Sequence, residues 1–175
     1  MALSDIPNAP DGDFRAVCTM IGLMIIIWAR AEHALALSIG LTHLAAGPIR
    51  AFKEPPISLK GRLKFIRAAL TDVPQFSAFK QEGERTAHLF SELAPLRHKF
   101  IHSASHQKEA TQFEGMLLGI DGGKQTVEYH SFNLQTAADF IPRIVALNDD
   151  AHRLLAHVHA SFPNRVDRVH VITQN

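Results

Sequence analysis

One stretch of the sequence decides how the rest of the chain is interpreted. It reads Glu92-Leu93-Ala94-Pro95-Leu96-Arg97-His98-Lys99-Phe100-Ile101-His102-Ser103. On a helical wheel of about 100° per residue, the apolar residues in and just before it share one arc. These expected core residues are Leu89, Leu93, Leu96 and Phe100. The pattern therefore predicts the second half of a long helix.

A second arc of this helix carries cationic and small side chains. Arg97, His98 and His102 fall on this arc, beside the apolar one. The small residues along it are Ala87, Ser91, Ala94 and Ser105. Because small side chains let another backbone approach closely, we expect the apolar arc to pack inside the domain and the second arc to receive a partner.

The cationic residues also form a short motif. An Arg is followed by a polar residue, by three more residues and then by a His, over residues 97–102. This pattern resembles the R-x4-6-H motif of the HEPN superfamily, whose small helical domains include many RNA-cleaving toxins and abortive-infection effectors. In that family the residue after the Arg is often Asn, Asp or His, and here it is His98. The resemblance covers roughly residues 14–106, and it departs from several toxin branches at Ala104, where they carry Tyr.

The resemblance implies a homodimer that cleaves RNA at a composite site in its interface. It implies that Arg97 binds phosphate, that His102 is the acid–base residue and that His98 is a positioning group. Lys99 and the basic helix residues Lys60, Arg62 and Lys64 would hold the flanking RNA strand. The expected products carry a 2′,3′-cyclic phosphate and a 5′-hydroxyl, and no cofactor is expected. An antitoxin or regulatory protein stays open as a further partner.

The chemistry of the residue types agrees with this expectation. Histidine suits acid–base work because its pKa lies near neutral, and arginine suits a phosphate because its charged fork donates hydrogen bonds in pairs. Positions 97 and 102 lie roughly 140° apart around a helix. One copy therefore presents half a site, whereas two copies across a two-fold axis would surround one cleft.

Composition limits the function classes. A chain of 175 residues with a net charge of +1 predicts one soluble domain that is not coated in nucleic acid. Charge is nevertheless uneven, because only Glu54 opposes the basic residues between positions 50 and 67. Those basic residues are Arg50, Lys53, Lys60, Arg62, Lys64 and Arg67. Such a patch can steer a polyanion, and a solvated helix face is the alternative.

The N-terminal part predicts a cytoplasmic protein that does not bind a membrane. A single cysteine, Cys18, fits a reducing compartment and is expected in the core. Residues 1–13 have no basic segment of the kind that signal peptides carry. The apolar run 16–29 is shorter than the about 20 residues that span a bilayer. Glu32, which interrupts the apolar character of this helix, is a candidate support for Arg30 or Arg97.

The expected fold is mainly α, a bundle of about four helices with one β-hairpin inserted before the last helix. The predicted helices cover residues 14–45, 59–70, 76–102 and 137–161, and the hairpin covers about 113–132. Ser58 and Thr136 are expected to cap the second and last helices, and Pro95 is expected to kink the third. A loose arm (1–13) and a short extended tail (163–175) flank an HEPN-like domain (14–162).

Two other functions remain open. His98, His102 and His106 are spaced i, i+4, i+8, so they could line one side of a helix and bind a metal, with His43 or Glu32 as additional ligands. The chain could also be a helical dimer that acts as a binding or scaffold module without chemistry. The last helix carries His152, His157 and His159, which do not share one face and are expected at the surface.

Overall fold

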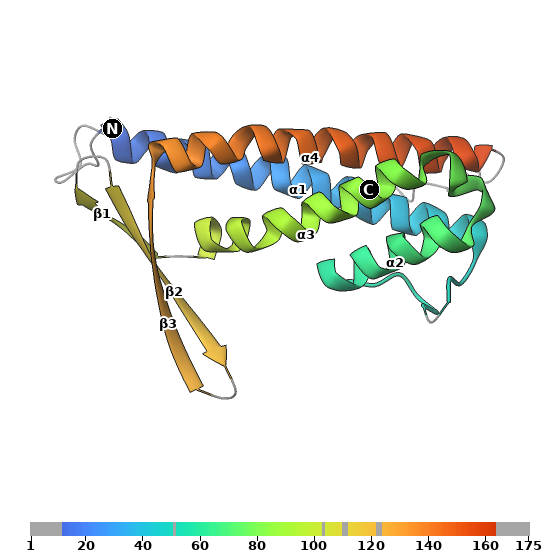
Figure 1. The fold of residues 1–175 in the computed structure, drawn as a ribbon, viewed down its shortest axis with the longest axis horizontal. Coiled ribbons are helices and arrows are strands. Elements are labelled where there is room, and N and C mark those ends of the chain that lie inside the picture. Colours follow the sequence, from blue (N-terminus) through green and yellow to red (C-terminus); the bar gives the residue numbers. More distant parts are fainter. Residues whose placement is uncertain (1–11, 51, 103, 110–111, 122–123, 164–175) are drawn as a thin grey trace, which may run out of the picture. The chain divides into compact units, whose positions relative to one another are not determined.

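The computed structural model describes residues 12–50, 52–102, 104–109, 112–121 and 124–163. This part of the chain is mainly helical, and an antiparallel hairpin precedes the last helix, so the predicted fold class is confirmed (Figure 1). The α-helices of the described residues are α1 (Gly12–Ala46), α2 (Leu59–Asp72), α3 (Lys80–His102) and α4 (Leu134–Ser161).

The chain divides into two compact units. The first comprises Met1–Ile27 and Leu93–Val145, and the second comprises Trp28–Glu92 and Ala146–Asn175. Helices α1, α3 and α4 each contribute one part to each unit. The units are described separately below.

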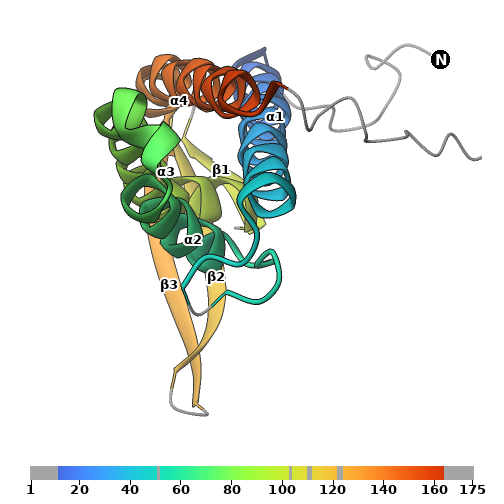
Figure 2. The same cartoon turned by 90° about the vertical axis from the view of Figure 1, so that its right-hand side faces the viewer.

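The second unit has an aromatic core. Trp28 of α1 is buried and meets Phe90 of α3 edge to face, with ring centroids 5.6 Å apart. Helix α2 runs beside the first part of α3 (Figure 2). As predicted, Ser58 caps α2, because its hydroxyl accepts a hydrogen bond from the backbone N–H of Gly61 at 3.2 Å. The helix predicted from residue 76 instead begins with a 3₁₀ helix, η2 (Pro74–Phe79), before α3.

The first unit contains the sheet. The hairpin consists of β2 (Gln112–Asp121) and β3 (Lys124–Asn133), and the register pairs Asp121 with Lys124. A further strand that the sequence did not predict, β1 (Ala104–Glu109), pairs antiparallel with β2, so the strand order is β1-β2-β3. Helix α3 remains continuous through Pro95 and ends at His102. Phe100 of α3 stacks on Phe140 of α4 with ring centroids 5.3 Å apart.

The cap of α4 differs from the prediction. Asn133, not Thr136, begins the helix, because its side-chain oxygen accepts a hydrogen bond from the backbone N–H of Thr136 at 2.8 Å. The Thr136 hydroxyl donates to the same oxygen at 2.9 Å. Asparagine caps helices at least as well as threonine, so the helix starts three residues earlier than the sequence pattern indicated. The predicted arm up to residue 11 and the tail from residue 164 lie outside the described residues.

Helix α1 leaves part of its apolar surface uncovered. Its exposed large apolar residues are Leu23, Ile25, Ile26, Leu37 and Leu44. The segment Cys18–Ala46 is long and apolar enough to cross a membrane by length and composition, and 28% of its most apolar window is buried. Core helices of soluble proteins and signal sequences share these properties. Cys18, expected in the core, is exposed.

Candidate functional site

Arg97 lies closer to the buried side of α3 than the sequence pattern indicated. Leu93 and Phe100, one turn before and after it, are both buried, and Arg97 itself is half-buried. Leu96, expected in the core, is 37% exposed, whereas Phe90 is fully buried. The buried arc of α3 is therefore rotated from the predicted one, and Arg97 falls within it.

The small-residue arc of α3 is also used differently from the expectation. Ala87 is buried, and its backbone carbonyl accepts a hydrogen bond from Arg67 of α2 at 3.3 Å. Ser91 accepts a second bond from the same guanidinium at 3.2 Å. In the second unit this arc therefore contacts α2, and Ser105, expected on the same arc, belongs to β1. The whole arc therefore cannot form a surface on which a partner helix packs closely.

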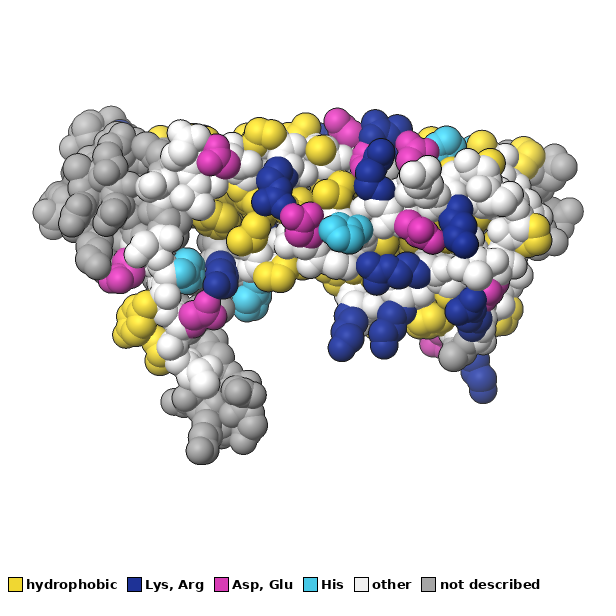
Figure 3. Space-filling view, in the orientation of Figure 1, with side chains coloured by type: hydrophobic (Ala, Val, Ile, Leu, Met, Phe, Trp, Pro, Cys, Tyr) yellow, Lys and Arg dark blue, Asp and Glu magenta, His cyan; other side chains and the backbone are white. Residues whose placement is uncertain are grey.

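Lys99 joins the end of α3 to the hairpin. Its ammonium donates a hydrogen bond to Oε1 of Glu128 on β3 at 2.5 Å. Both side chains are partly exposed, at 39% and 54%. Beside the sheet, Figure 3 shows basic, acidic and histidine side chains gathered on one surface. The predicted RNA-binding residue Lys99 thus already has an acidic neighbour.

His98 and His130 act electrostatically on the same carboxylate. Hydrogen bonding and charge from Lys99 lower the pKa of Glu128, and the charges of His130 and His98 lower it further. Lys99 and Glu128 form an ion pair, and the two histidines lie near enough to influence the Glu128 carboxylate. We call these four residues the hairpin cluster: His98, Lys99, Glu128 and His130. Imidazoles can transfer protons near neutral pH, and the cations attract phosphate.

The sequence did not single out Glu128 or His130. Alternate residues of a strand point to the same face, so their i, i+2 spacing on the predicted hairpin was a signal that they act together. The expected acid–base residue, His102, is the last residue of α3, and its side chain lies outside the described residues. Helical geometry places position 102 four residues after His98 on the same side of α3, roughly 140° from Arg97.

The predicted basic residues of α2 do not share one surface. Lys60 and Lys64 are exposed one turn apart, and Arg67 lies one turn later on the same side of the helix. Arg62 is half-buried, and its Nε donates to the backbone carbonyl of Pro56 at 3.4 Å. Arg62 therefore stabilises the segment before α2, whereas Lys60 and Lys64 face solvent.

The proposed metal ligands are not aligned along a helix. Because α3 ends at His102, His106 lies in β1, and the expected i, i+4, i+8 line is broken. Within the described ranges, no group of three His, Cys, Asp or Glu side chains is arranged to hold a metal ion. His43 and Glu32, the expected additional ligands, are half-buried on the α1 part of the second unit.

A charged network joins α3 to α4 in the second unit. The buried carboxylate of Asp150 accepts hydrogen bonds from Arg85 at 2.8 and 3.1 Å and from Arg153. Glu82 accepts a hydrogen bond from Nε2 of His157 at 3.0 Å, and that imidazole stacks on the ring of Phe79. The expected surface residue His157 is thus only partly exposed.

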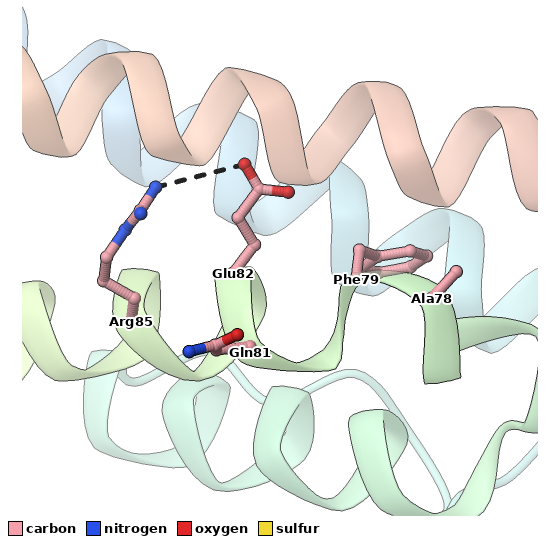
Figure 4. Close-up of a pocket in the computed structure, with 5 residues that line it drawn as sticks. All are labelled: Ala78, Phe79, Gln81, Glu82 and Arg85. Atoms are coloured by element: carbon pink, nitrogen blue, oxygen red, sulfur yellow. Dashed lines mark ion pairs between the residues drawn. The ribbon is translucent and has the colours of Figure 1, made fainter.

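A cavity of about 500 Å³ lies beside this network. Figure 4 shows Glu82 and Arg85 of α3 pointing toward α4, with an ion pair of 3.9 Å between them. Each carboxylate of the network faces guanidinium groups, so its charges are largely balanced internally. This arrangement is typical of a structural contact between helices.

Comparison of the chain with protein-family models, with curated proteins and with solved structures gave no match.

Proposed function

We propose that the chain is an HEPN-like, metal-independent RNA endonuclease whose site combines Arg97 and His102 from two copies. The observation that carries the proposal is the hairpin cluster at the end of α3, where cations and imidazoles gather next to the motif. Cleavage without a metal requires proton-transfer groups and positive charge at one place. The cluster adds imidazoles and a cation of these kinds next to positions 97 and 102 at the end of α3.

Each group has a defined task in the proposed reaction. The ribose 2′-oxygen attacks the adjacent phosphorus, its proton passes to an imidazole, and the bond from phosphorus to the 5′-oxygen breaks. A second histidine, in its protonated imidazolium form, donates the proton that the leaving 5′-oxygen takes up. Arg97 neutralises the charge on the phosphorane oxygens. The products are a 2′,3′-cyclic phosphate and a 5′-hydroxyl, so no oxidant, cofactor or water is consumed.

His102 is the proposed acid–base residue, and His98 is the proposed positioning group. His98 acts through the hairpin cluster, because its charge affects Glu128 and because Glu128 holds Lys99. When RNA approaches, a phosphate can take the place of Glu128 as the acceptor for Lys99. The hairpin would then regulate how strongly the end of α3 attracts the flanking strand.

The proposal requires a second copy of the chain. Leu23 and Ile26 are exposed one turn apart, so they form an apolar face on the part of α1 that belongs to the first unit. An uncovered apolar helix face of this kind favours association. We propose that this face of α1 contributes to a homodimer, which would be required to bring Arg97 of one copy near His102 of the other.

The test is cleavage of a mixed RNA substrate by the purified protein in excess EDTA. Wild-type protein should cleave, whereas Arg97→Ala and His102→Ala should each lose at least about a hundredfold in rate, as expected when a charge-stabilising donor or an acid–base group is removed. His159→Ala is the matched control, because His159 is an exposed histidine of α4 in the second unit. Each variant should melt within a few degrees of wild type.

Two outcomes would reject the proposed site. Equal cleavage by wild type, Arg97→Ala and His102→Ala would show that other residues cleave the RNA. Cleavage that needs added Zn²⁺ or Mn²⁺ would show that the enzyme is metal-dependent.

The oligomeric state is tested separately by light scattering at micromolar concentration. Wild type should be a dimer, and Ile26→Glu should shift it toward monomer. Ile57→Glu is the control, because Ile57 is 88% exposed but lies before α2 and not on α1. A monomeric wild-type protein would eliminate the composite site.

The second candidate function is a binding or scaffold dimer without chemistry. The exposed apolar face of α1 favours it, because association needs no reactive group. A dimer that binds RNA or a regulatory protein, but does not cleave RNA with or without metal, would establish this alternative.

A further inference from the structure

The second unit contains a basic groove that the proposed cleavage chemistry does not use. Its volume is about 490 Å³, within the range of ligand pockets. The groove is lined by Arg50, Lys64, Arg67, Ala68, Thr71, Glu84 and His88. Figure 3 shows Lys and Arg side chains gathered over α2. Three cationic side chains and one histidine thus line the groove with the carboxylate of Glu84, and one of the cations, Arg50, is paired with Asp72.

Arg67 is held in position by α3. Its Nη2 donates to the carbonyl of Ala87 and to the hydroxyl of Ser91. These bonds use one of the three guanidinium nitrogens, so Nε and Nη1 still carry hydrogens that can meet another acceptor. A fixed guanidinium loses little conformational entropy when an anion binds.

Arg50 also lines the groove, and its side chain is fixed by Asp72. Its backbone has a positive φ of 47°, which a residue with a side chain rarely adopts. Two hydrogen bonds to Asp72, of 2.6 and 2.8 Å, hold the guanidinium, and the pKa of Arg50 is raised by this pairing. Backbone strain of this kind is often found at binding sites, where the surrounding structure maintains it.

Lys64 contributes a positive charge on a flexible side chain, which can adjust to the position of a phosphate. It is exposed on α2 one turn before Arg67, and Lys60 lies one turn earlier on the same side. A lysine ammonium acts as a point charge for a phosphate, whereas an arginine fork binds two of its oxygens. Together, Lys64 and Arg67 provide the donors that a tetrahedral phosphate requires.

We propose that this groove binds a nucleotide phosphate, with Lys64 and Arg67 as its direct ligands and with Arg50, which is paired with Asp72, as a fixed part of its wall. Glu84 and His88 line the same groove and offer an acceptor and an imidazole ring to the nucleoside part. The phosphate can belong to a free mononucleotide or to an RNA strand. The inference concerns binding and involves neither Arg97 nor His102, and it shares only Lys64 with the residues expected to hold the flanking RNA strand.

The experiment measures binding of three probes to the full chain by isothermal titration calorimetry. The probes are adenosine 5′-monophosphate, adenosine and a twelve-nucleotide RNA carrying 2′-O-methyl groups, which cannot be cleaved through the 2′-oxygen. The monophosphate should bind at least tenfold more tightly than adenosine. Lys64→Gln and Lys64→Gln/Arg67→Gln should weaken the binding of the phosphorylated probes at least tenfold.

Two matched proteins serve as controls. Lys80→Gln removes one charge from an exposed lysine of the same unit outside the groove, and it should bind as wild type does. His159→Ala, which alters an exposed histidine of the same unit outside the groove, should also retain binding. The single variant Lys64→Gln alters only an exposed side chain, so it remains informative if the double variant does not fold.

The two ligand sources give different results. If the RNA binds at least tenfold more tightly than the monophosphate, and both depend on Lys64, the groove holds an RNA strand. If the two bind equally well, the ligand is a mononucleotide. The inference is overturned if adenosine binds as tightly as the monophosphate, if neither phosphorylated probe binds, or if Lys64→Gln and Lys80→Gln have equal effects.

Discussion

Arg85 donates two hydrogen bonds to the two carboxylate oxygens of Asp150, although the residues lie 65 positions apart in the sequence. The carboxylate is buried, whereas about half of the Arg85 side chain is exposed. Arg153, one turn further along α4, pairs with the same carboxylate. Asp150 therefore has two cations, and either can compensate its charge when the other is removed.

The first prediction concerns this shared carboxylate. Arg85→Gln and Arg153→Gln should each lower the free energy of unfolding modestly, because one guanidinium still faces Asp150. The double variant should lose more than the sum of the two. In the double variant the buried carboxylate of Asp150 has neither guanidinium beside it, and this lowers the free energy of unfolding by about 3 kcal/mol. Chemical denaturation at pH 7 measures these free energies.

A third substitution tests the cause. Adding Asp150→Asn to the double variant should restore part of the stability, because the buried charge is removed. Additive losses in the double variant, or no recovery after the carboxylate is neutralised, would contradict the explanation.

The second prediction concerns Glu128 and pH. Lys99 lowers the pKa of Glu128, so the folded protein favours the ionised carboxylate. The lowered pKa stabilises the folded state at pH values above about 4.3, the ordinary pKa of a glutamate. This stabilisation is lost as the pH falls through the lower pKa of the folded state.

An NMR titration of the Glu128 side chain should find its pKa below the ordinary value. Lys99→Met should raise it toward that value, whereas Lys80→Met should leave it unchanged. An ordinary pKa in the wild-type protein would show that the pair is absent in solution.

The third prediction concerns the close approach of α3 to α2 at Gly83. A Cβ atom at this position would lie 2.7 and 2.8 Å from the two terminal carbons of Leu70, which is buried. Gly83→Ala should therefore lower the free energy of unfolding by about 1 kcal/mol, because overpacking outweighs the gain in helix propensity. Thermal or urea denaturation provides the measurement.

Gly40 is the matched control for this substitution. It lies in α1, and a Cβ atom there would meet nothing within 4 Å. Gly40→Ala should stabilise the protein by up to about 1 kcal/mol. In a Leu70→Ala background, Gly83→Ala should become stabilising as well, and a persistent loss there would exclude Leu70 as the cause.

Much of the fold could be predicted because its signals are local. Apolar periodicity and the pair Gly47-Pro48, residue types that end helices, bounded α1 within two residues of its observed ends. Ser58 identified the start of α2, and the sequence Asp121-Gly122-Gly123-Lys124, which is typical of tight turns, identified the hairpin. Each of these signals depends on residues that are close together in the sequence, so no tertiary contact had to be known.

The remaining features depend on distant neighbours. Strand β1 has little apolar character, and it forms because β2 offers a free edge for pairing. The sequence pattern placed the buried arc of α3 wrongly. Phe90 packs against Trp28 and is buried, whereas Leu96, which was expected in the core, is partly exposed. Periodicity alone did not distinguish two neighbouring apolar arcs of the same helix.

The candidate site was predicted only in part. The motif identified the end of α3, but Glu128 lies 29 residues after Lys99 and reaches it through the hairpin. Likewise, the groove combines Arg50 from before α2 with Lys64 of α2 and His88 of α3. A single sequence gives no indication of which distant charges meet.

The position of β3 at one edge of the described sheet has a consequence for solubility. A ten-residue edge strand can template a strand of another molecule, and Val127 and Tyr129 expose apolar surface along it. Glu128 places a charge between them, and two such strands brought together in register would oppose their carboxylates. The residue that attaches the hairpin to α3 therefore also protects the protein against edge-to-edge aggregation.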